Sequence, residues 1–264
     1  MLSWLAYLMI GIVVGFIAGL LGIGGGAVMV SMLVFVFTAQ GILTQHVLHM
    51  ALATAMATII FTSLSSMRAH HAHGAVDWNI TRMMAPGMLA GSFTAALIAG
   101  LIPTRPLAAM FTALMFYAAT QILFDLRPKT TRQLPGPAGV FAAGSLIGAV
   151  SSLLAAGGAF LSIPFLAWCN VPIRRAIGTA AANGFPIAIA GTAGYILQGW
   201  RMEALPAGSL GYVYLPALAL VAVASMTTAP LGARLAHRLP VKRLRMVLAL
   251  MLYAVAIRLL IRLW

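Results

Sequence analysis

Glycine-rich stretches interrupt the two longest apolar runs of this sequence, and a backbone opened in this way could bind an anion. The first stretch is Gly22-Ile23-Gly24-Gly25-Gly26, and its counterpart is Ala155-Ala156-Gly157-Gly158. Glycine adopts backbone conformations that end a helix. A helix that restarts near Ala27 or Ala159 would present free N–H groups and the positive end of its dipole. The pattern therefore predicts an anion site without a charged side chain. The alternative is that the glycines only allow a tight turn and close packing.

Polar side chains recur at matching places on two other apolar runs. Thr54 and Thr58 lie four residues apart and share one helix face, and Thr179 and Asn183 do the same. Hydroxyl and amide groups bind anions without the cost of burying a charged Lys or Arg. We expect these four residues to line the anion site. The alternative is that each threonine bonds back to its own helix or holds neighbouring helices together.

Histidines are the side chains here that could carry protons, since no Asp or Glu stands at the centre of an apolar run. His46 and His49, near the start of the second apolar run, are candidates for proton coupling, with an interfacial position as the alternative. A second histidine group, within residues 70–77, matches no strong metal-ligand spacing and is typical of a basic loop. The sequence therefore predicts no metal, no cofactor and no catalytic residue.

The composition of the chain indicates which environment surrounds the helices that hold these residues. Only 7% of the 264 residues are charged and 62% are hydrophobic, whereas a soluble domain carries roughly 25% charged residues. The 16 Lys and Arg outnumber 3 acidic residues, but they stand in short segments between apolar runs. Membrane proteins hold their cytoplasmic loops in this way. We therefore expect a lipid bilayer around the chain and no nucleic-acid partner.

The apolar runs fall into two halves that repeat the same order. Each half opens with a long run that contains one glycine-rich stretch, and three spans of ordinary transmembrane length follow. The runs cover residues 2–37, 47–66, 83–102 and 106–124, and then 138–168, 176–198, 210–236 and 241–263. Residues also match between the halves. An offset of 133 pairs Gly15 with Gly148, an offset of 125 pairs Thr54 with Thr179, and an offset of 137 pairs Pro103 with Pro240. These matches predict an internal duplication, which is typical of membrane transporters.

Basic residues indicate how the long run of each half crosses the bilayer. Residues 2–37 would extend about 54 Å as one helix, far beyond the hydrocarbon thickness, so we expect a hairpin that turns at the glycines. With two hairpins, the basic residues divide unevenly between the two sides. Of the 16, only Arg105, Arg201, Arg258 and Arg262 fall on one side, and the other twelve fall on the cytoplasmic side. Each half then crosses an odd number of times, so the repeats are inverted and both termini are periplasmic.

The predicted fold is an all-α integral membrane protein with two inverted repeats. Residues 1–124 form the first repeat, 125–137 a cytoplasmic linker and 138–264 the second repeat. Each repeat is expected to hold a broken, re-entrant helical hairpin and three transmembrane helices.

Four segments resemble the sulfite exporter TauE/SafE-like permease family, membrane transporters of the 4-toluene sulfonate uptake permease type. They are residues 15–33 (GFIAGLLGIGGGAVMVSML), 51–78, 176–182 (AIGTAAA) and 205–245, of which the last is the most specific. The resemblance covers essentially the whole chain. The sequence departs from the family at Ser31 and Ala53, where proline and glycine are common, and at Ala155-Ala156, where the family often repeats the fuller glycine motif.

The resemblance implies a secondary transporter in the bacterial inner membrane rather than an enzyme. It implies export of a small sulfur-containing anion such as sulfite or an organosulfonate, for example sulfoacetate. A permease for another small organic anion, such as a carboxylate, is the alternative. The expected partners are this anion and the lipid bilayer, and a homo-oligomer is compatible with the sequence.

Overall fold

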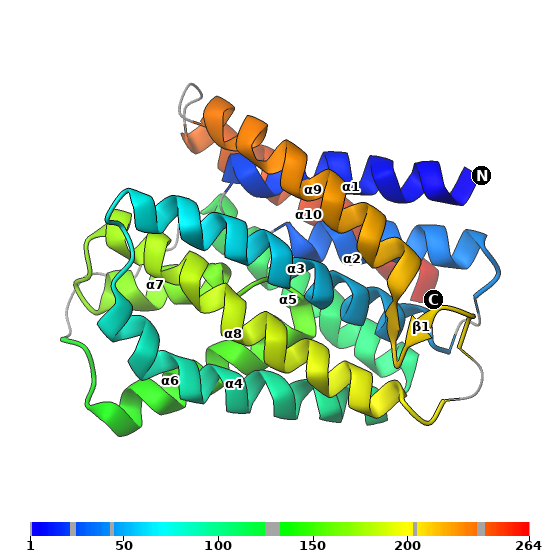
Figure 1. The fold of residues 1–264 in the computed structure, drawn as a ribbon, viewed down its shortest axis with the longest axis horizontal. Helices are drawn as coiled ribbons and strands as arrows, with labels where there is room; N and C mark the ends of the chain where they lie inside the picture. Colours follow the sequence, from blue (N-terminus) through cyan, green and yellow to red (C-terminus); the bar gives the residue numbers. More distant parts are fainter. Residues whose placement is uncertain are drawn as a thin grey trace.

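The computed structural model describes residues 2–21, 25–42, 45–124, 133–202, 205–236 and 241–263. Ten helices make up nearly all of these residues (Figure 1), as the composition predicts. They are α1 (Leu2–Leu21), α2 (Gly26–Ala39), α3 (Val47–Ala72), α4 (Trp78–Leu101), α5 (Thr104–Leu123), α6 (Pro137–Leu154), α7 (Ala159–Trp168), α8 (Ile173–Gly199), α9 (Leu215–Ala236) and α10 (Val241–Leu263).

Within the described chain, α3, α4, α5, α6 and α8 are each long and apolar enough to cross a membrane. The shortest of them, α6, has 18 residues and extends about 27 Å, close to the thickness of the hydrocarbon. Other helices are apolar but have shorter apolar stretches of 10–17 residues, among them α2 and α7. The chain is therefore a multi-pass helical membrane protein, which confirms the predicted all-α membrane fold, whereas the inverted repeats stay a prediction.

Both long broken runs form helical hairpins, as predicted. In the first, the Tyr7 hydroxyl near the start of α1 donates a hydrogen bond to Gln40 Oε1 just beyond α2, at 2.6 Å. The two helices therefore run antiparallel. In the second, α6 begins beside the start of α4, and α7 leads directly into the start of α8 at the same end of the bundle. A 10-residue α7 is too short to span the bilayer and ends the hairpin near that end.

Small residues bring two pairs of helices into close contact, α1 with α9 and α4 with α6. A Cβ added at Gly11 would lie 2.6 Å from the Cβ of Ala224, and one added at Gly144 would lie 2.7 Å from the carbonyl oxygen of Met84. Lipid gives helices no hydrophobic drive to associate, so such close van der Waals packing holds them together. The glycines spaced four apart whose contacts the structure describes all lie in these two helix pairs. These are Gly11, Gly15, Gly87, Gly91, Gly144 and Gly148.

Helices α3 and α8 form the centre of the bundle. Of the most apolar 18 residues of each helix, 78% are buried in α3 and 61% in α8. The share is 39% in each of α4, α5 and α6. They cross antiparallel, with Gly184 beside Ser63 and Gly191 beside Met56. These two helices carry the polar residues that the sequence analysis singled out.

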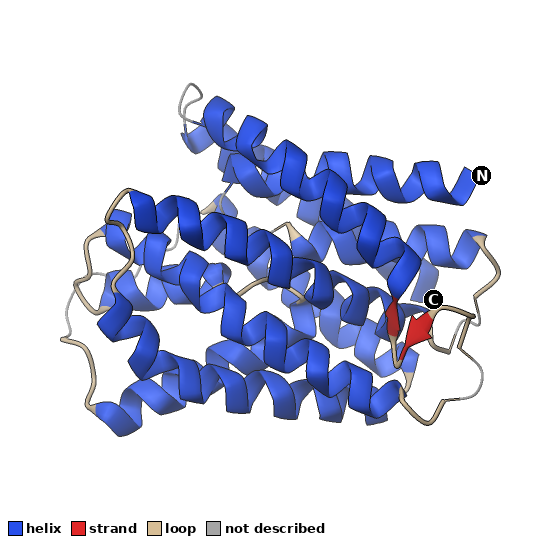
Figure 2. Ribbon diagram, in the orientation of Figure 1, coloured by secondary structure: helices blue, strands red, loops and turns tan. Residues whose placement is uncertain are grey.

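The described chain contains one small sheet, which lies at the end of the bundle where both termini are drawn (Figure 2). Strands β1 (Ser209–Leu210) and β2 (Val213–Tyr214) pair antiparallel. Gly211 begins the turn between them with a φ of 54°. Glycine tolerates this left-handed conformation, and a Cβ there would also lie 2.2 Å from the carbonyl oxygen of Ile196. The hairpin therefore packs tightly on α8 and holds Tyr212 and Tyr214 beside α3.

Candidate functional site

The two helix breaks meet inside the bundle. A Cβ on Gly26 would lie only 1.7 Å from the carbonyl oxygen of Ala155. No side chain can therefore stand at position 26 without moving the backbone of the other half. The sequence predicted two breaks at matching places, and the structure brings their backbones into contact.

The backbone at both breaks adopts the left-handed conformation that favours glycine. The φ angle is 55° at Gly25, 61° at Gly157 and 80° at Gly158. Ala155 shares this conformation at 49°, although an alanine there is strained by about 1–2 kcal/mol. Alanine thus occupies a position where glycine would be the usual choice, as the departure from the family motif indicates. The predicted residues Gly22 and Gly24 lie outside the described residues.

Helix restarts occur where the sequence predicted them, and each leaves free N–H groups. Helix α2 has Gly25 as its N-cap with no side-chain cap, and its first ladder bond runs from Met29 N to Gly25 O at 3.0 Å. The N–H groups of Gly26, Ala27 and Val28 therefore precede the ladder. Helix α7 is built in the same way. Gly158 is its N-cap, and the first bond runs from Ser162 N to Gly158 O at 2.9 Å.

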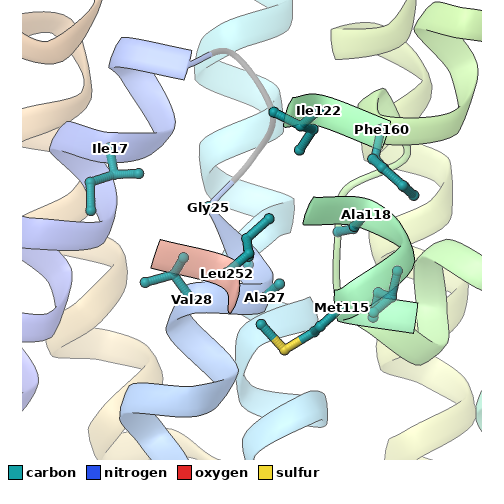
Figure 3. Close-up of a pocket in the computed structure, with 12 residues that line it drawn as sticks. Ile17, Gly25, Ala27, Val28, Met115, Ala118, Ile122, Phe160 and Leu252 are labelled. Carbon is teal, nitrogen blue, oxygen red and sulfur yellow. The ribbon is translucent and has the colours of Figure 1, made fainter. Parts of the chain in front are cut away.

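A small cavity lies between the first break and the second (Figure 3). The first turn of α2 lines it, together with Ile17, Leu154, Ala156, Phe160, Leu252 and three residues of α5. Its volume is about 40 Å³, which is room for about three water molecules. The side chains around it are apolar, so the N–H groups of the first turn of α2 are the polar groups that an anion would meet there. Of the predicted site residues, Gly25, Gly26 and Ala27 line this cavity.

Gly157 and Gly158 face the central helices instead. The carbonyl oxygen of Gly157 lies 2.6 Å from the position that a Cβ on Gly184 would take. A Cβ on Gly158 would lie 2.5 Å from Cδ1 of Ile187. The second break therefore packs closely on α8, at Gly184, which follows Asn183 in the sequence.

Each of the matched threonines is buried and holds the backbone of another element. Thr54 Oγ1 accepts a hydrogen bond from Tyr214 N at 3.1 Å, and Thr179 Oγ1 accepts one from Asp77 N at 3.0 Å. Thr58 donates back to the carbonyl oxygen of Thr54 at 2.8 Å. These bonds correspond to the alternative that the sequence left open, in which threonines hold helices together. That Thr54, Thr58 and Thr179 line a transport path stays a prediction.

Asn183 and three serines place buried polar atoms around the second break. The Nδ2 of Asn183 donates weakly to Met84 Sδ at 3.7 Å, and its Oδ1 has no hydrogen-bond partner among the described residues. The hydroxyls of Ser151, Ser152 and Ser162 are likewise buried and without a partner there. A buried polar group without a partner is costly and is available to a ligand. The sequence analysis missed these serines, although Ser151-Ser152 stand directly before the second break.

His49 is buried where α3 begins. Its Nε2 lies 3.0 Å from the carbonyl oxygens of both Ala99 and Ile102, so Nε2 carries the hydrogen and donates. Its ring stacks on Tyr212 with the centroids 5.2 Å apart, and Nδ1 has no partner in the described part of the chain. His46 precedes the helix, and burial lowers its pKa below the ordinary value near 6.5. Proton coupling through either histidine stays a prediction.

The second histidine group lies at the opposite end of α3. Asp77 caps α4 by accepting hydrogen bonds from the N–H groups of Asn79 and Ile80, and it lies 4.0 Å from Arg175. His71 Nδ1 accepts a hydrogen bond from Trp78 Nε1 at 3.1 Å. These contacts give the segment a structural role in joining α3 to α4 and α8.

Comparison with known proteins matches one family over almost the whole chain. The model of the family described as sulfite exporter TauE/SafE matches residues 7–259. A probable membrane transporter protein of Haemophilus influenzae is 35% identical over 257 residues, which is 97% of each chain. The probable membrane transporter protein YdhB of Bacillus subtilis is 29% identical over 248 residues, 91% of each chain. A probable membrane transporter protein of Methanocaldococcus jannaschii is 23% identical over 256 residues, 92% of this chain and 90% of that one. No solved structure matches the chain.

Proposed function

We propose, from the premise that this chain belongs to the sulfite exporter TauE/SafE family, that it exports a small sulfur-containing anion. The family and the relatives described above identify the chain as a membrane transporter. The substrate we propose is sulfite or an organosulfonate such as sulfoacetate. The chain would act as a secondary transporter in the bacterial inner membrane.

The meeting of the two helix breaks is the observation that supports this proposal. An anion in a membrane needs fixed donors to replace its water shell, and buried charges are expensive there. The first turn of α2 offers the N–H groups of Gly26, Ala27 and Val28 at the positive end of a helix dipole. The backbone of the other break touches Gly26 at the same point. Discontinuous helices that point their N-termini at an anionic group are a recurring arrangement in secondary transporters.

The proposal includes two inverted repeats, and the packing of the helices supports it. If α1–α5 correspond to α6–α10, then α1 packed on α9 is the counterpart of α6 packed on α4. These two pairs make the most extensive contacts in the described chain. The small residues in both contacts also correspond, since the offset of 133 pairs Gly11 and Gly15 with Gly144 and Gly148. The first helix of each half would thus pack on the fourth helix of the other half.

Basic residues support a cytoplasmic position for the end of the bundle opposite the termini. Arg68 lies near the end of α3, Arg82 near the start of α4, and Arg174 and Arg175 in the first turn of α8, which all belong to that end (Figure 1). Cytoplasmic loops carry the excess of Lys and Arg. Both termini would then be periplasmic.

Flux into proteoliposomes tests the function directly. Purified protein is reconstituted, and uptake of labelled sulfite and of labelled sulfoacetate is measured with and without a pH gradient. We expect saturable uptake of at least one of the two above that of protein-free vesicles, with the other competing. Uptake of a small carboxylate alone would favour the alternative permease. Absence of flux for every sulfur-containing anion, with folded protein in the vesicles, would contradict the proposal.

A further inference from the structure

A second, larger cavity is lined by α1, α2 and α10, three of the helices that also line the first cavity. Its volume is about 210 Å³. Its lining residues are Ile10, Ser31, Met32, Val34, Phe35, Val36, Val255 and Arg258. We call it the outer groove, because its lining on α2 and α10 lies toward the ends of these helices, and both helices end where the termini are drawn (Figure 1).

The outer groove lies along the same helices as the small cavity of Figure 3, which we call the central cavity. On α1 the lining passes from Ile17 to Ile10, two turns nearer the terminus, and on α10 it passes from Leu252 to Val255 one turn on. On α2 it passes from the first turn to Ser31 and Phe35. The start of α1 and the ends of α2 and α10 lie at one end of the bundle (Figure 1), so all three progressions lead toward that end.

One cation stands among the lining residues of the outer groove. The guanidinium carbon of Arg258 lies 4.9 Å from the centroid of the Phe35 ring, a cation–π contact that holds the charge over the groove. Asp77, which is the one carboxylate in the part of the chain that the structure describes, lies instead with Arg175 at the opposite end. The charge of Arg258 is therefore not paired with that carboxylate. The remaining lining offers no competing charge, so Arg258 sets the sign of the potential there.

We propose that the outer groove is the route between the central cavity and the face that carries the termini, and that Arg258 draws the transported anion into it. This inference rests on the proposed function, since it assumes that an anion occupies the central cavity. A narrow apolar seam by itself would repel a hydrated anion. A fixed cation at its mouth raises the local concentration of anions and lowers that of cations. Arg258 thus selects the sign of the charge, and the N–H groups of α2 bind the anion farther in.

Thiol labelling at Ser31 tests this proposal without requiring transport. Ser31 is half-buried in the groove, and its hydroxyl donates only to the carbonyl oxygen of Ala27 on its own helix. A Ser31→Cys variant is made in a Cys169→Ala background, because Cys169 is the only cysteine of the chain. The protein is placed in phosphatidylcholine vesicles. Its rates of reaction are measured with an anionic methanethiosulfonate, the ethylsulfonate, and with a cationic one, the ethyltrimethylammonium.

We expect the anionic reagent to be favoured and Arg258→Gln to lower the ratio of the two rates about fivefold. Ser31 and Arg258 line the same groove, and a unit charge nearby changes each rate by about two- to threefold, in opposite directions for the two reagents. Arg258→Lys should keep most of the ratio. Arg201→Gln is the matched control, since it removes a basic residue at the same end outside the groove lining, and it should leave the ratio unchanged. An unchanged ratio in folded Arg258→Gln protein overturns the proposal.

Protection by methanesulfonate gives a second readout that needs no change at Arg258. The anion should slow the modification of Ser31→Cys, and sodium chloride at equal ionic strength should slow it less. Lack of protection contradicts the proposal. So does a cysteine at 31 that reacts with neither reagent, because an acyl chain or closed helices would then fill the groove. If the chain transports a sulfur-containing anion but fails these tests, only the route is wrong. If labelling succeeds and no flux is found, the proposed function fails instead.

Discussion

The hydroxyl of Thr54 accepts a hydrogen bond from the backbone N–H of Tyr214, which lies directly before α9. The hydroxyl of Thr179 accepts one from the N–H of Asp77, which lies directly before α4. The offset of 125 relates the two threonines, and the offset of 137 that pairs Pro103 with Pro240 also pairs Asp77 with Tyr214. Each central helix thus holds the start of the fourth helix of the opposite half. This exchange further supports the inverted repeat that we propose.

Replacing either threonine by valine should weaken the contact between the central helix and the start of the fourth helix of the opposite half. Valine keeps the shape of the side chain but removes the acceptor, so the buried N–H of Tyr214 or Asp77 loses its partner. We expect Thr54→Val and Thr179→Val each to cost about 0.5–2 kcal/mol of stability, seen as a lower midpoint of thermal unfolding in detergent. Thr58→Val is the control, because Thr58 bonds only to its own helix, and it should change the midpoint less.

Cysteine at the same threonines tests whether they also line a transport path. Thr54→Cys and Thr179→Cys, in the Cys169→Ala background, should react with a small membrane-impermeant thiol reagent, and the transported anion should protect them. Both threonines are fully buried in this structure, so the reaction requires a conformation in which the bundle opens. Inert cysteines at both positions in an actively transporting protein would show that these residues only join helices.

Valine at the glycine breaks should abolish transport and spare the fold. Gly25 has a φ of 55° and Gly158 a φ of 80°, where a β-branched residue is strained by about 1–2 kcal/mol. At Gly158 the obstacle is the end of a side chain, Cδ1 of Ile187 at 2.5 Å, and at Gly25 the contacts with Val14 and Ala18 at 3.0–3.1 Å require a shift of only a few tenths of an ångström. We expect Gly25→Val and Gly158→Val to elute as folded protein on size exclusion and to lack flux.

Gly11→Val is the matched comparison for these variants. A Cβ there meets Ala224 and the backbone of Val221 within 2.8 Å, which would force α1 away from α9. Its main effect should be lower expression and stability. If the break variants are well expressed and transport like the unchanged chain, the breaks are not the anion site.

Transport should respond to pH below about 6.5 if His46 or His49 couples protons. Burial lowers the pKa of His46, so its imidazole is neutral at pH 7 and gains a proton only as the pH falls below its ordinary value near 6.5. The rate should therefore be constant above pH 7 and change only as the pH falls below 6.5. His46→Gln and His49→Gln keep an N–H donor but cannot titrate, and one of them should flatten this profile.

His73→Gln serves as the control for the pH profile, since His73 is exposed at the opposite end of α3. It should leave the profile as it is. A profile that survives in the double variant His46→Gln, His49→Gln would exclude both histidines from proton coupling.

Reporter fusions test the orientation in the membrane. With both termini at one end of the bundle, one fusion decides the orientation of the whole chain. A C-terminal alkaline phosphatase fusion should be active, and a C-terminal green fluorescent protein fusion should be dark in bacteria that export it through the general secretory route. Bright fluorescence from a full-length fusion would place the termini in the cytoplasm and reverse the proposed direction of the outer groove.

The sequence predicted the helices, the hairpins and helix restarts near Ala27 and Ala159, because each depends on the residues of its own segment; the structure begins α2 one residue earlier, at Gly26. An apolar run of 36 residues is too long for one crossing, and glycine at a positive φ ends a helix wherever it stands. The partners of Thr54 and Thr179 are backbone N–H groups. Almost every residue carries one, so the sequence could not show which of them these threonines bind. The position of Arg258 over Phe35 depends on how α10 rotates against α2, which only the packing of the whole bundle determines.

The contact between Gly26 and Ala155 limits how the two halves can diverge in evolution. In the duplication that we propose, each copy would otherwise be free to accumulate its own substitutions. Here a residue larger than glycine at position 26 requires the backbone at position 155 to retreat, because their separation leaves no room for a Cβ. Drift in one copy is therefore permitted only with a matched change in the other. Among relatives, positions 26 and 155 should change together or not at all, even where the surrounding helices have lost recognisable similarity.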